Sequence, residues 1–204
     1  MGAWRYPAPD LRAPAIDFLP RHACVKLVER GIMTRDAAYA ALPDGSFVPE
    51  RCVAESPPRA RDLVAAAANY LGCPYLWAGK SFLGIDCSGL VQNAFCDLGQ
   101  TVPRDTDMQR DAIGAAVEAE DAAQLRRGDL LFLPGHVMIY EGAGTIIHAD
   151  GRRMAVVRET LAGFLAGRGM RLGGLTVRRP GEAAIKESAQ QQTAPHTLHA
   201  AAAS

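Results

Sequence analysis

The sequence predicts an α+β fold in which helices come first and pack on a mostly antiparallel sheet of five to six strands. Two observations lead to this prediction. Helical periodicity and capping signals occur before residue 118, whereas after Gly128 short apolar or alternating runs follow one another with Gly and Pro between them. Helices and strands that segregate along the chain in this way disfavour a doubly wound parallel sheet, which alternates them.

Composition narrows the class of protein. The 204 residues are 49% hydrophobic, enough for one medium domain with appendages, and 22 basic residues balance 22 acidic ones. A net charge of zero gives no electrostatic reason to expect nucleic acid or an anionic membrane as a partner. No apolar run approaches the roughly 18 residues of a membrane span, and the first residues lack the regions of a secretory signal. We therefore expect a cytoplasmic protein.

The chain divides into four parts. Residues 1–20 are rich in proline and predict an extended arm. Residues 21–54 predict a small β unit with a turn at Asp44-Gly45, too short to be stable unless it packs on the main domain. That main domain covers residues 55–180. Residues 181–204 are polar, rich in Ala and Gln and without periodicity, so we expect them to be disordered.

Three helices are expected in the main domain. The first covers residues 55–72, with Ser56 as its cap, two prolines in its first turn and Gly72 at its end. The second begins at Cys87 and ends at Gly99, after a glycine-containing loop. Its apolar stripe consists of Leu90, Val91, Ala94 and Phe95. The third lies within residues 103–117 and begins near Asp105 or Thr106.

Consecutive strands are expected after Gly128. They are short runs bounded by turn residues, which favours antiparallel pairing of neighbours. The five runs are DLLFLP (129–134), HVMIYEG (136–142), TIIHAD (145–150), MAVVRE (154–159) and LGGLTVRRP (172–180).

The five cysteines are an odd number without a close C-x-x-C pair, which predicts free thiols and not a disulfide framework. Cys24, Cys52, Cys73 and Cys96 are each expected to be small buried hydrophobic residues. Cys87 differs because it opens a helix, where free backbone N–H groups favour the thiolate and can stabilise an oxyanion. Its position alone leaves a buried core thiol and a nucleophile equally open.

A nucleophilic thiol needs a base, and two histidines stand where one is required. His136 begins one predicted strand and His148 lies near the end of the next, with a glycine-containing hairpin turn between them. Folding this hairpin brings the two rings near each other, so that His148 can orient His136. A lone histidine at a strand end is more often structural. His22, His196 and His199 lie in the arm and the tail and are expected to have no role in the site.

A metal site is the other chemistry open to one cysteine and two histidines, because zinc in enzymes often has three protein ligands and an open position. The close ligand pairs of zinc motifs are missing from this sequence. We therefore predict no metal and no cofactor.

The residues also resemble a known family. The stretches YLGCPYLWAGKSFLGIDCSGLVQ, VPRDTDMQ, LRRGDLLFLPGHVMIYEG and TIIHAD follow one another as in the NlpC family of bacterial cell-wall cysteine peptidases, over roughly residues 58–180. The resemblance implies a compact papain-like fold. It matches Cys87 to the nucleophile, His136 to the base and His148 to the orienting third residue.

Within that family the sequence looks most like the γ-D-glutamyl-L-diamino acid endopeptidases, of the dipeptidyl-peptidase VI type. This likeness implies a substrate derived from peptidoglycan stem peptides, cut between D-glutamate and diaminopimelate or lysine. It also implies that the substrate site comprises Tyr75, Asp86, Ser88, Asp105 and Thr106. A carboxylate such as Asp86 is suited to bind the free amine of an N-terminal L-alanine.

The N-terminal region departs from this subgroup, which usually carries one or two complete Src-homology-3-like domains there. Residues 21–54 resemble only a remnant of such a domain. Three functions stay open: a cysteine hydrolase, an acyltransferase or amidase on the same scaffold, and a non-catalytic module that binds cell-wall peptides. The sequence does not predict the oligomeric state.

Overall fold

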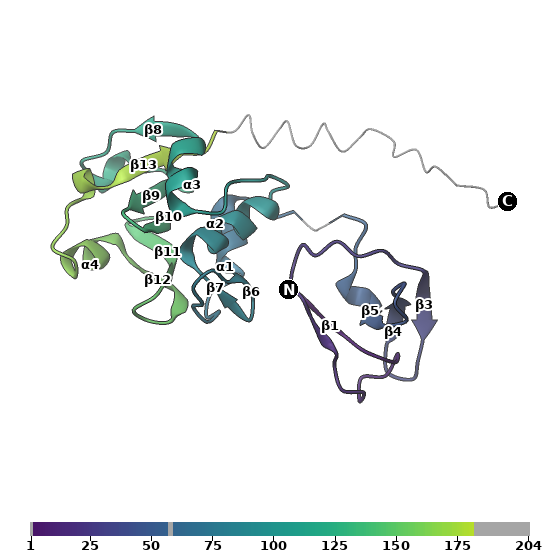
Figure 1. Cartoon of the computed structure of the whole chain (residues 1–204). Helices are drawn as coiled ribbons and strands as arrows, with labels where there is room; N and C mark the ends of the chain where they lie inside the picture. The colour runs from purple at the N-terminus through teal and green to yellow at the C-terminus, as the bar shows by residue number, and fades with distance from the viewer. Residues whose placement is uncertain (1, 57–58, 182–204) are drawn as a thin grey trace.

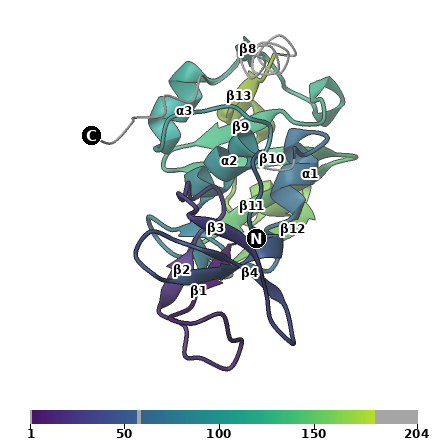
Figure 2. The ribbon, with the colours of Figure 1, turned by 90° about the vertical axis from the view of Figure 1, so that its right-hand side faces the viewer.

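The structure, a computed structural model, describes residues 2–56 and 59–181. It consists of a large α+β body and a smaller unit of N-terminal strands gathered to one side of it (Figures 1 and 2). The tail predicted to be disordered lies outside the described residues apart from Gly181. Over the part of the chain that is described, no helix has the length and apolarity to span a membrane.

A six-stranded sheet forms the centre of the body, and all of its neighbouring strands are antiparallel, in the order β12-β11-β10-β9-β13-β8. This confirms the predicted α+β class. The strands are β8 (Ala115–Val117), β9 (Leu130–Leu133), β10 (His136–Gly142), β11 (Thr145–Asp150), β12 (Ala155–Thr160) and β13 (Thr176–Arg179). Only β8 was not expected, because its residues were placed in the third helix.

Helices cover both faces of this sheet. On one face lie α1 (Leu63–Ala68) and α2 (Cys87–Cys96), and the other face packs against α4 (Leu161–Ala166), which was not predicted. Alternation along the strands explains the two cores: Val137 and Ile139 of β10 face α1 and α2, whereas Met138 faces α4. The predicted apolar stripe of α2 is buried throughout, with Leu90, Val91, Ala94 and Phe95 all at 3% exposure or less.

The remaining elements are short. They are α3 (Thr106–Ala112), the hairpin strands β6 (Lys80–Ser81) and β7 (Gly84–Ile85), and the 3-10 turns η1 (Glu50–Cys52), η2 (Ala122–Gln124) and η3 (Leu172–Gly174). The start of α3 agrees with the prediction, since Asp105 is its N-cap residue.

The first helix begins later than predicted. Asp62, not Ser56, is the N-cap of α1, and its carboxylate accepts a hydrogen bond from the backbone N–H of Ala65 at 2.7 Å. The same carboxylate receives Arg127 at 3.1 Å. The expected cap at Ser56 was wrong because Asp62 both caps the helix and pairs with a distant arginine.

The N-terminal unit contains five strands, namely β1 (Ala3–Arg5), β2 (Asp17–Leu19), β3 (Glu29–Met33), β4 (Ala38–Ala41) and β5 (Phe47–Pro49). Residues 1–20 are therefore not the expected extended arm. Strands β1 and β2 pair with each other, and Tyr6 and Phe47 exchange two backbone hydrogen bonds of 2.8 Å that join this hairpin to β5. The likeness of residues 21–54 to part of a Src-homology-3-like domain stays a prediction.

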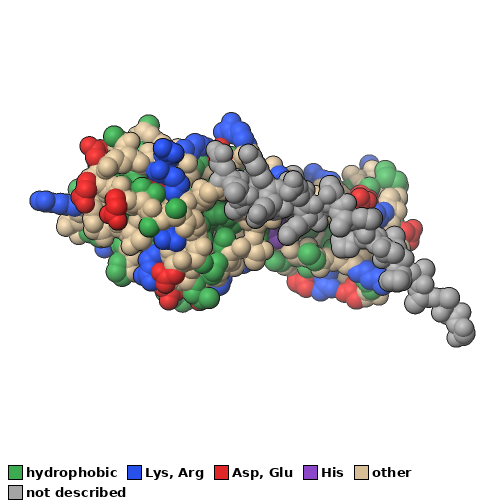
Figure 3. Space-filling view, turned by 90° about the horizontal axis from the view of Figure 1, so that it is seen from above, with side chains coloured by type: hydrophobic (Ala, Val, Ile, Leu, Met, Phe, Trp, Pro, Cys, Tyr) green, Lys and Arg blue, Asp and Glu red, His purple; other side chains and the backbone are tan. Residues whose placement is uncertain are grey.

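The N-terminal unit packs on the body, as its short length required. Asp97, the C-cap residue of α2, is completely buried and accepts Arg21 Nε at 2.6 Å, while His22 Nε2 lies 2.8 Å from the same oxygen. Elsewhere, acidic and basic side chains are interspersed on the visible surface of Figure 3, as the balanced composition suggests.

All five thiols are unpaired. Cys73 is buried and Cys96 is half-buried, but Cys24 and Cys52 are exposed, so the expectation that these two are core residues was wrong.

Candidate active site

Cys87 is the first residue of α2, and its side chain is buried and lines a cleft. Its exposure is 6%, and its Sγ lies 3.9 Å from Thr106 Oγ1 and 4.0 Å from the carbonyl oxygen of Gly135. The backbone of Val137 also lies close enough to the sulfur to favour the thiolate. Cys87 therefore contacts the chain on both sides of His136, and the question of core thiol or nucleophile resolves into a thiol that is part of the core and lines a cleft.

The cleft has a volume of about 410 Å³. All five predicted substrate residues line it together with Cys87, which confirms their proximity. The lining residues are Tyr75, Trp77, Ala78, Asp86, Cys87, Ser88, Arg104, Asp105, Thr106, Asp107 and Gly135. None of them belongs to residues 2–56, so the described N-terminal strands do not wall this cleft.

His136 and His148 come together as the hairpin predicted. His136 begins β10 and His148 lies on β11, and their rings meet through Nε2 of His136 and Nδ1 of His148 at 2.9 Å. Opposite residues in this hairpin pair Ile139 with Ile147, which makes the two histidines diagonal neighbours on one face of the sheet. Among the described residues, the hydrogen bonds of the Cys87 thiol do not include the ring of His136.

Burial is the main influence on the pKa values of Cys87, His136 and His148. It raises the pKa of the Cys87 thiol, against the backbone of Val137 and the hydroxyl of Thr106, which lower it. Burial, with His148 and Arg168 close by, lowers the pKa of His136 to about 3. The expected depression of the thiol pKa by the helix N-terminus is therefore outweighed, and the resting site holds a neutral thiol beside neutral imidazoles.

Asp86 has a structural position that the sequence did not reveal. Its Oδ1 accepts the backbone N–H of Gly89 at 2.7 Å and so caps α2, and its two oxygens receive Arg104 at 3.0 and 2.7 Å. Arg104 also donates to Ser88 Oγ at 2.8 Å. A carboxylate with these partners and 7% exposure is poorly placed to receive an amine from a substrate.

Arg104 was missed because its partners are distant in sequence, although it lies within the quoted VPRDTDMQ stretch. Its neighbour Asp105 presents a different kind of carboxylate. The side chain of Asp105 is exposed at the rim of the cleft and does not bond the N–H groups of α3. Tyr75 precedes Cys87 in the sequence, and its side chain is half-buried. Burial together with the nearby Cys87 raises the pKa of its hydroxyl.

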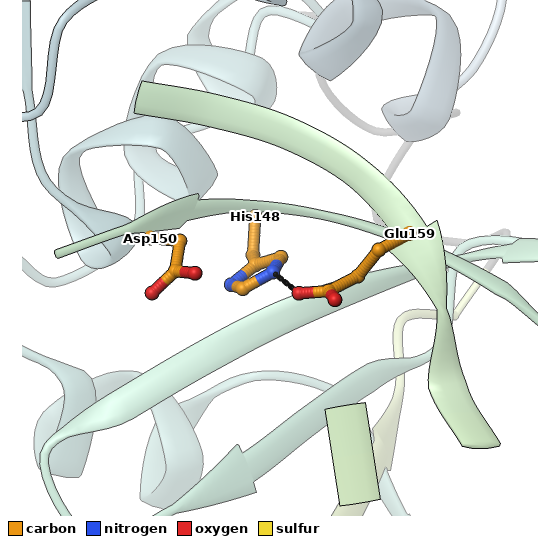
Figure 4. A group of neighbouring side chains, drawn as sticks. All are labelled: His148, Asp150 and Glu159. Carbon is orange, nitrogen blue, oxygen red and sulfur yellow. Dashed lines mark hydrogen bonds and ion pairs between the residues drawn. The ribbon is translucent and has the colours of Figure 1, made fainter. Parts of the chain in front are cut away.

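Glu159 on β12 is the second residue that the sequence did not single out. Its Oε1 lies 2.8 Å from Nε2 of His148 (Figure 4). Its Oε2 receives Arg153 at 2.8 Å. The alternation of β12 places residues 157 and 159 on one face, opposite His148 and Ile146. That alternation is the signal that could have found it.

Among the described residues, His148, Asp150 and Glu159 form a group whose donor atoms lie within 4.8 Å of one another, which is close enough to ligate a metal. Two guanidinium groups balance the carboxylates: Arg153 and Arg168 lie 3.8 Å from the two oxygens of Asp150, and Arg153 also binds Glu159. Cationic neighbours disfavour a bound cation. The arrangement fits a hydrogen-bonded histidine better than a metal centre.

Part of the chain is similar to known proteins. Residues 72–166 match the model of the NlpC/P60 family. Dipeptidyl-peptidase 6 of Lysinibacillus sphaericus is 41% identical over 89 residues, which are 44% of this chain and 32% of that protein. A gamma-D-glutamyl-L-lysine dipeptidyl-peptidase of Bacillus cereus is 39% identical over 128 residues, 58% of this chain and 37% of that protein. The chain thus spans about a third of the length of these relatives.

A solved structure of an NlpC/P60 family protein from Bacillus cereus superposes with a TM-score of 0.63 and 26% identity, covering 87% of this chain and 60% of that protein. Residues 55–204 alone cannot account for this coverage, so the similarity extends into the N-terminal strands. The family model confirms the resemblance to the NlpC family over residues 72–166.

Proposed function

Because this chain carries an NlpC/P60 domain over residues 72–166, we propose that it is a cysteine peptidase acting on peptides derived from peptidoglycan. The bond cleaved is the one between γ-D-glutamate and the L-diamino acid of the stem peptide, diaminopimelate or lysine. The observation that carries the proposal is the placement of Cys87, at a helix N-terminus in a cleft, against the backbone on both sides of His136. Relatives named dipeptidyl-peptidase 6 and gamma-D-glutamyl-L-lysine dipeptidyl-peptidase support the choice of bond.

In the proposed reaction His136 takes the proton of Cys87, and the sulfur attacks the γ-D-glutamyl carbonyl carbon. The C–N bond breaks, His136 returns the proton to the departing amine, and a thioester remains on Cys87. Water then attacks the thioester, giving the γ-carboxylate and the free thiol. The backbone N–H groups at the start of α2 are positioned to stabilise the oxyanion of both tetrahedral intermediates.

Recognition of the peptide end is assigned to Asp105. A free N-terminal L-alanine carries an ammonium group, and an exposed carboxylate at the cleft rim can bind it by a charge-assisted hydrogen bond. Asp86 was the other candidate, but Arg104 and the N-terminus of α2 already occupy its oxygens. We therefore expect selectivity for a free amine to depend on Asp105.

The test of the nucleophile is release of diaminopimelate from L-Ala-γ-D-Glu-meso-diaminopimelate by the wild type and by Cys87→Ala. Release should fall to background in Cys87→Ala and persist in Cys52→Ala, which removes an exposed thiol outside the cleft. Cleavage that survives in Cys87→Ala would refute the assignment. An added amine acceptor separates hydrolysis from transfer, since a new amide product would identify an acyltransferase.

The test of Asp105 compares the same tripeptide with a free and with an acetylated N-terminus. The wild type should prefer the free amine, and Asp105→Asn should lose most of that preference through a higher KM. Equal preference in both proteins would remove Asp105 from the substrate site. A wild type that binds the tripeptide without cleaving it would instead support a binding module.

A further inference from the structure

We propose that Glu159 is a positioning residue that sets the tautomers of His148 and, through it, of His136, so that Nδ1 of His136 is left free to accept the thiol proton. This inference rests on the proposed function and deepens it. It concerns a residue that does not line the cleft and is not among the eight site residues that the sequence singled out.

The geometry is a continuous chain of hydrogen bonds across three neighbouring strands. Nε2 of His136 on β10 meets Nδ1 of His148 on β11 at 2.9 Å, and Nε2 of His148 meets Oε1 of Glu159 on β12 at 2.8 Å. The side chain of His148 is fully buried and that of Glu159 is 14% exposed. Water therefore has little access to these groups and is poorly placed to replace either hydrogen bond.

The direction of each hydrogen bond follows from the carboxylate of Glu159, which ends the chain. An ionised carboxylate can only accept, so Nε2 of His148 must carry the hydrogen that it shares with Glu159. A neutral imidazole has one N–H, which leaves Nδ1 of His148 as an acceptor. Nε2 of His136 must then donate to it, and Nδ1 of His136 is left with a lone pair. That tautomer is the one a general base requires.

The carboxylate of Glu159 also binds a guanidinium group. Arg153 Nη2 donates to Oε2 of Glu159 at 2.8 Å, on the oxygen that does not face His148. The other charged groups close to His148 are Asp150 and Arg168, which lie 3.8 Å from each other. The hydrogen bond to Glu159 works against the burial that lowers the pKa of His148, but His148 stays neutral at ordinary pH because burial prevails.

The same chain serves the transition state. When Nδ1 of His136 takes the thiol proton, the ring becomes an imidazolium in a site where burial disfavours that charge. Its Nε2–H already points at the lone pair of His148, and the negative charge of Glu159 lies behind that ring. The proton stays on His136, so His148 and Glu159 stabilise the cation without being protonated themselves.

The test reads the tautomers directly. Two-dimensional NMR that correlates ring nitrogens with carbon-bound protons of ¹⁵N-labelled protein separates the Nδ1–H and Nε2–H forms of each histidine. In the wild type at pH 7 both rings should be Nε2–H. In Glu159→Ala the Nδ1–H form of both should become populated, and kcat should fall about 10- to 100-fold, as for other residues that orient a functional histidine, with KM changed little.

Two further variants make the experiment decisive. Glu159→Gln keeps an oxygen that can accept from His148, so it should retain the wild-type tautomers and lose less of kcat than the alanine variant. Glu141→Gln is the matched control, because Glu141 lies on β10 in an ion pair with Arg158 at 2.6 Å that does not touch either histidine. It should leave both tautomers and kcat unchanged.

The inference is overturned if His148 is Nδ1–H in the wild type, or if folded Glu159→Ala keeps both tautomers and the wild-type kcat. If Glu159→Ala does not fold, an Nδ1–H form of His148 in Glu159→Gln without loss of kcat overturns it equally. The NMR measurement needs no substrate, so tautomers that shift in Glu159→Ala support the positioning role even where the wild type fails to cleave the chosen peptide.

Discussion

Replacing Asp86 with alanine tests the claim that this carboxylate holds the site together and does not bind the substrate amine. The substitution removes the N-cap of α2 and leaves Arg104 without its carboxylate partner. Asp86 directly precedes Cys87, so both losses act beside the proposed nucleophile. We therefore expect a loss of stability together with a loss of activity, a combination that an amine-binding residue at the rim would not give.

The magnitude is set by the two interactions that are lost. An N-cap contributes about 1 kcal/mol, and breaking a buried ion pair by removing one partner costs about 3–5 kcal/mol. The lower end applies here because the Arg104 side chain is 30% exposed and water can partly replace its partner. One carboxylate serves both roles, so the two terms overlap and a total near 3 kcal/mol is expected. For a chain of this size that lowers the Tm by about 6–12 °C.

Thermal melts followed by circular dichroism, with urea titrations at 25 °C, provide the assay. Asp86→Asn keeps an oxygen for the N–H of Gly89 and loses only the charge, so its destabilisation should be smaller, about 1–2 kcal/mol. Asp105→Ala is the matched control, because its exposed carboxylate makes no cap, and it should melt with the wild type. If Asp86→Ala also melts with the wild type and only raises KM, the structural role is refuted and the amine-binding role returns.

Three other outcomes are expected from the same geometry. Because burial raises the pKa of Cys87, its alkylation by iodoacetamide should rise about tenfold per pH unit from pH 6 to 8, and a plateau below pH 7 would contradict a neutral resting thiol. Gly89→Ala would place a Cβ 2.5 Å from the carbonyl oxygen of Gly79 and should cost about 1–3 kcal/mol with a fall in kcat, whereas Gly174→Ala, with no atom within 4 Å, should do neither. Burial works to raise the pKa of Asp97, but the hydrogen bond from Arg21 and the closeness of His22 outweigh it and lower that pKa. The carboxylate therefore stabilises the fold above about pH 4, and Asp97→Asn should lose less stability than the wild type as pH falls below 4 in thermal melts, while equal losses would contradict the pairing.

The elements that could be predicted are those whose signals are local. Alternation and turn residues located β9 to β12, and the apolar stripe with its helix-start residues located α2. Strand β8 has three residues, and its conformation is decided by pairing with β13, about 60 residues later. Helix α4 has six residues and depends on a cap from Thr160 at the end of a strand. The N-terminal arm likewise folds through Tyr6 and Phe47, a pairing that no local pattern indicates.

The site residues also divide into those with a local signal in the sequence and those whose roles depend on distant partners. Cys87 and His136 each begin a well-patterned element and His148 lies within another, so the sequence could place them. Arg104 and Glu159 are charged residues at positions that usually face solvent, and their roles depend on partners 18 and 11 residues away. A charged residue has no local signal that separates a solvated side chain from one that neutralises or orients a buried group.

Two carboxylates at opposite ends of α2 tie this helix to different parts of the molecule. Asp86 caps its N-terminus, where the helix dipole favours a negative charge. Asp97 follows its C-terminus, where the dipole disfavours one, and Arg21 and His22 of the N-terminal unit compensate it. The N-terminal unit thus holds the helix that carries Cys87 from the end remote from the cleft, and none of its described residues lines that cleft. In the proposed enzyme the N-terminal unit fixes α2, and the proposed selection of the peptide end falls to Asp105 at the start of α3.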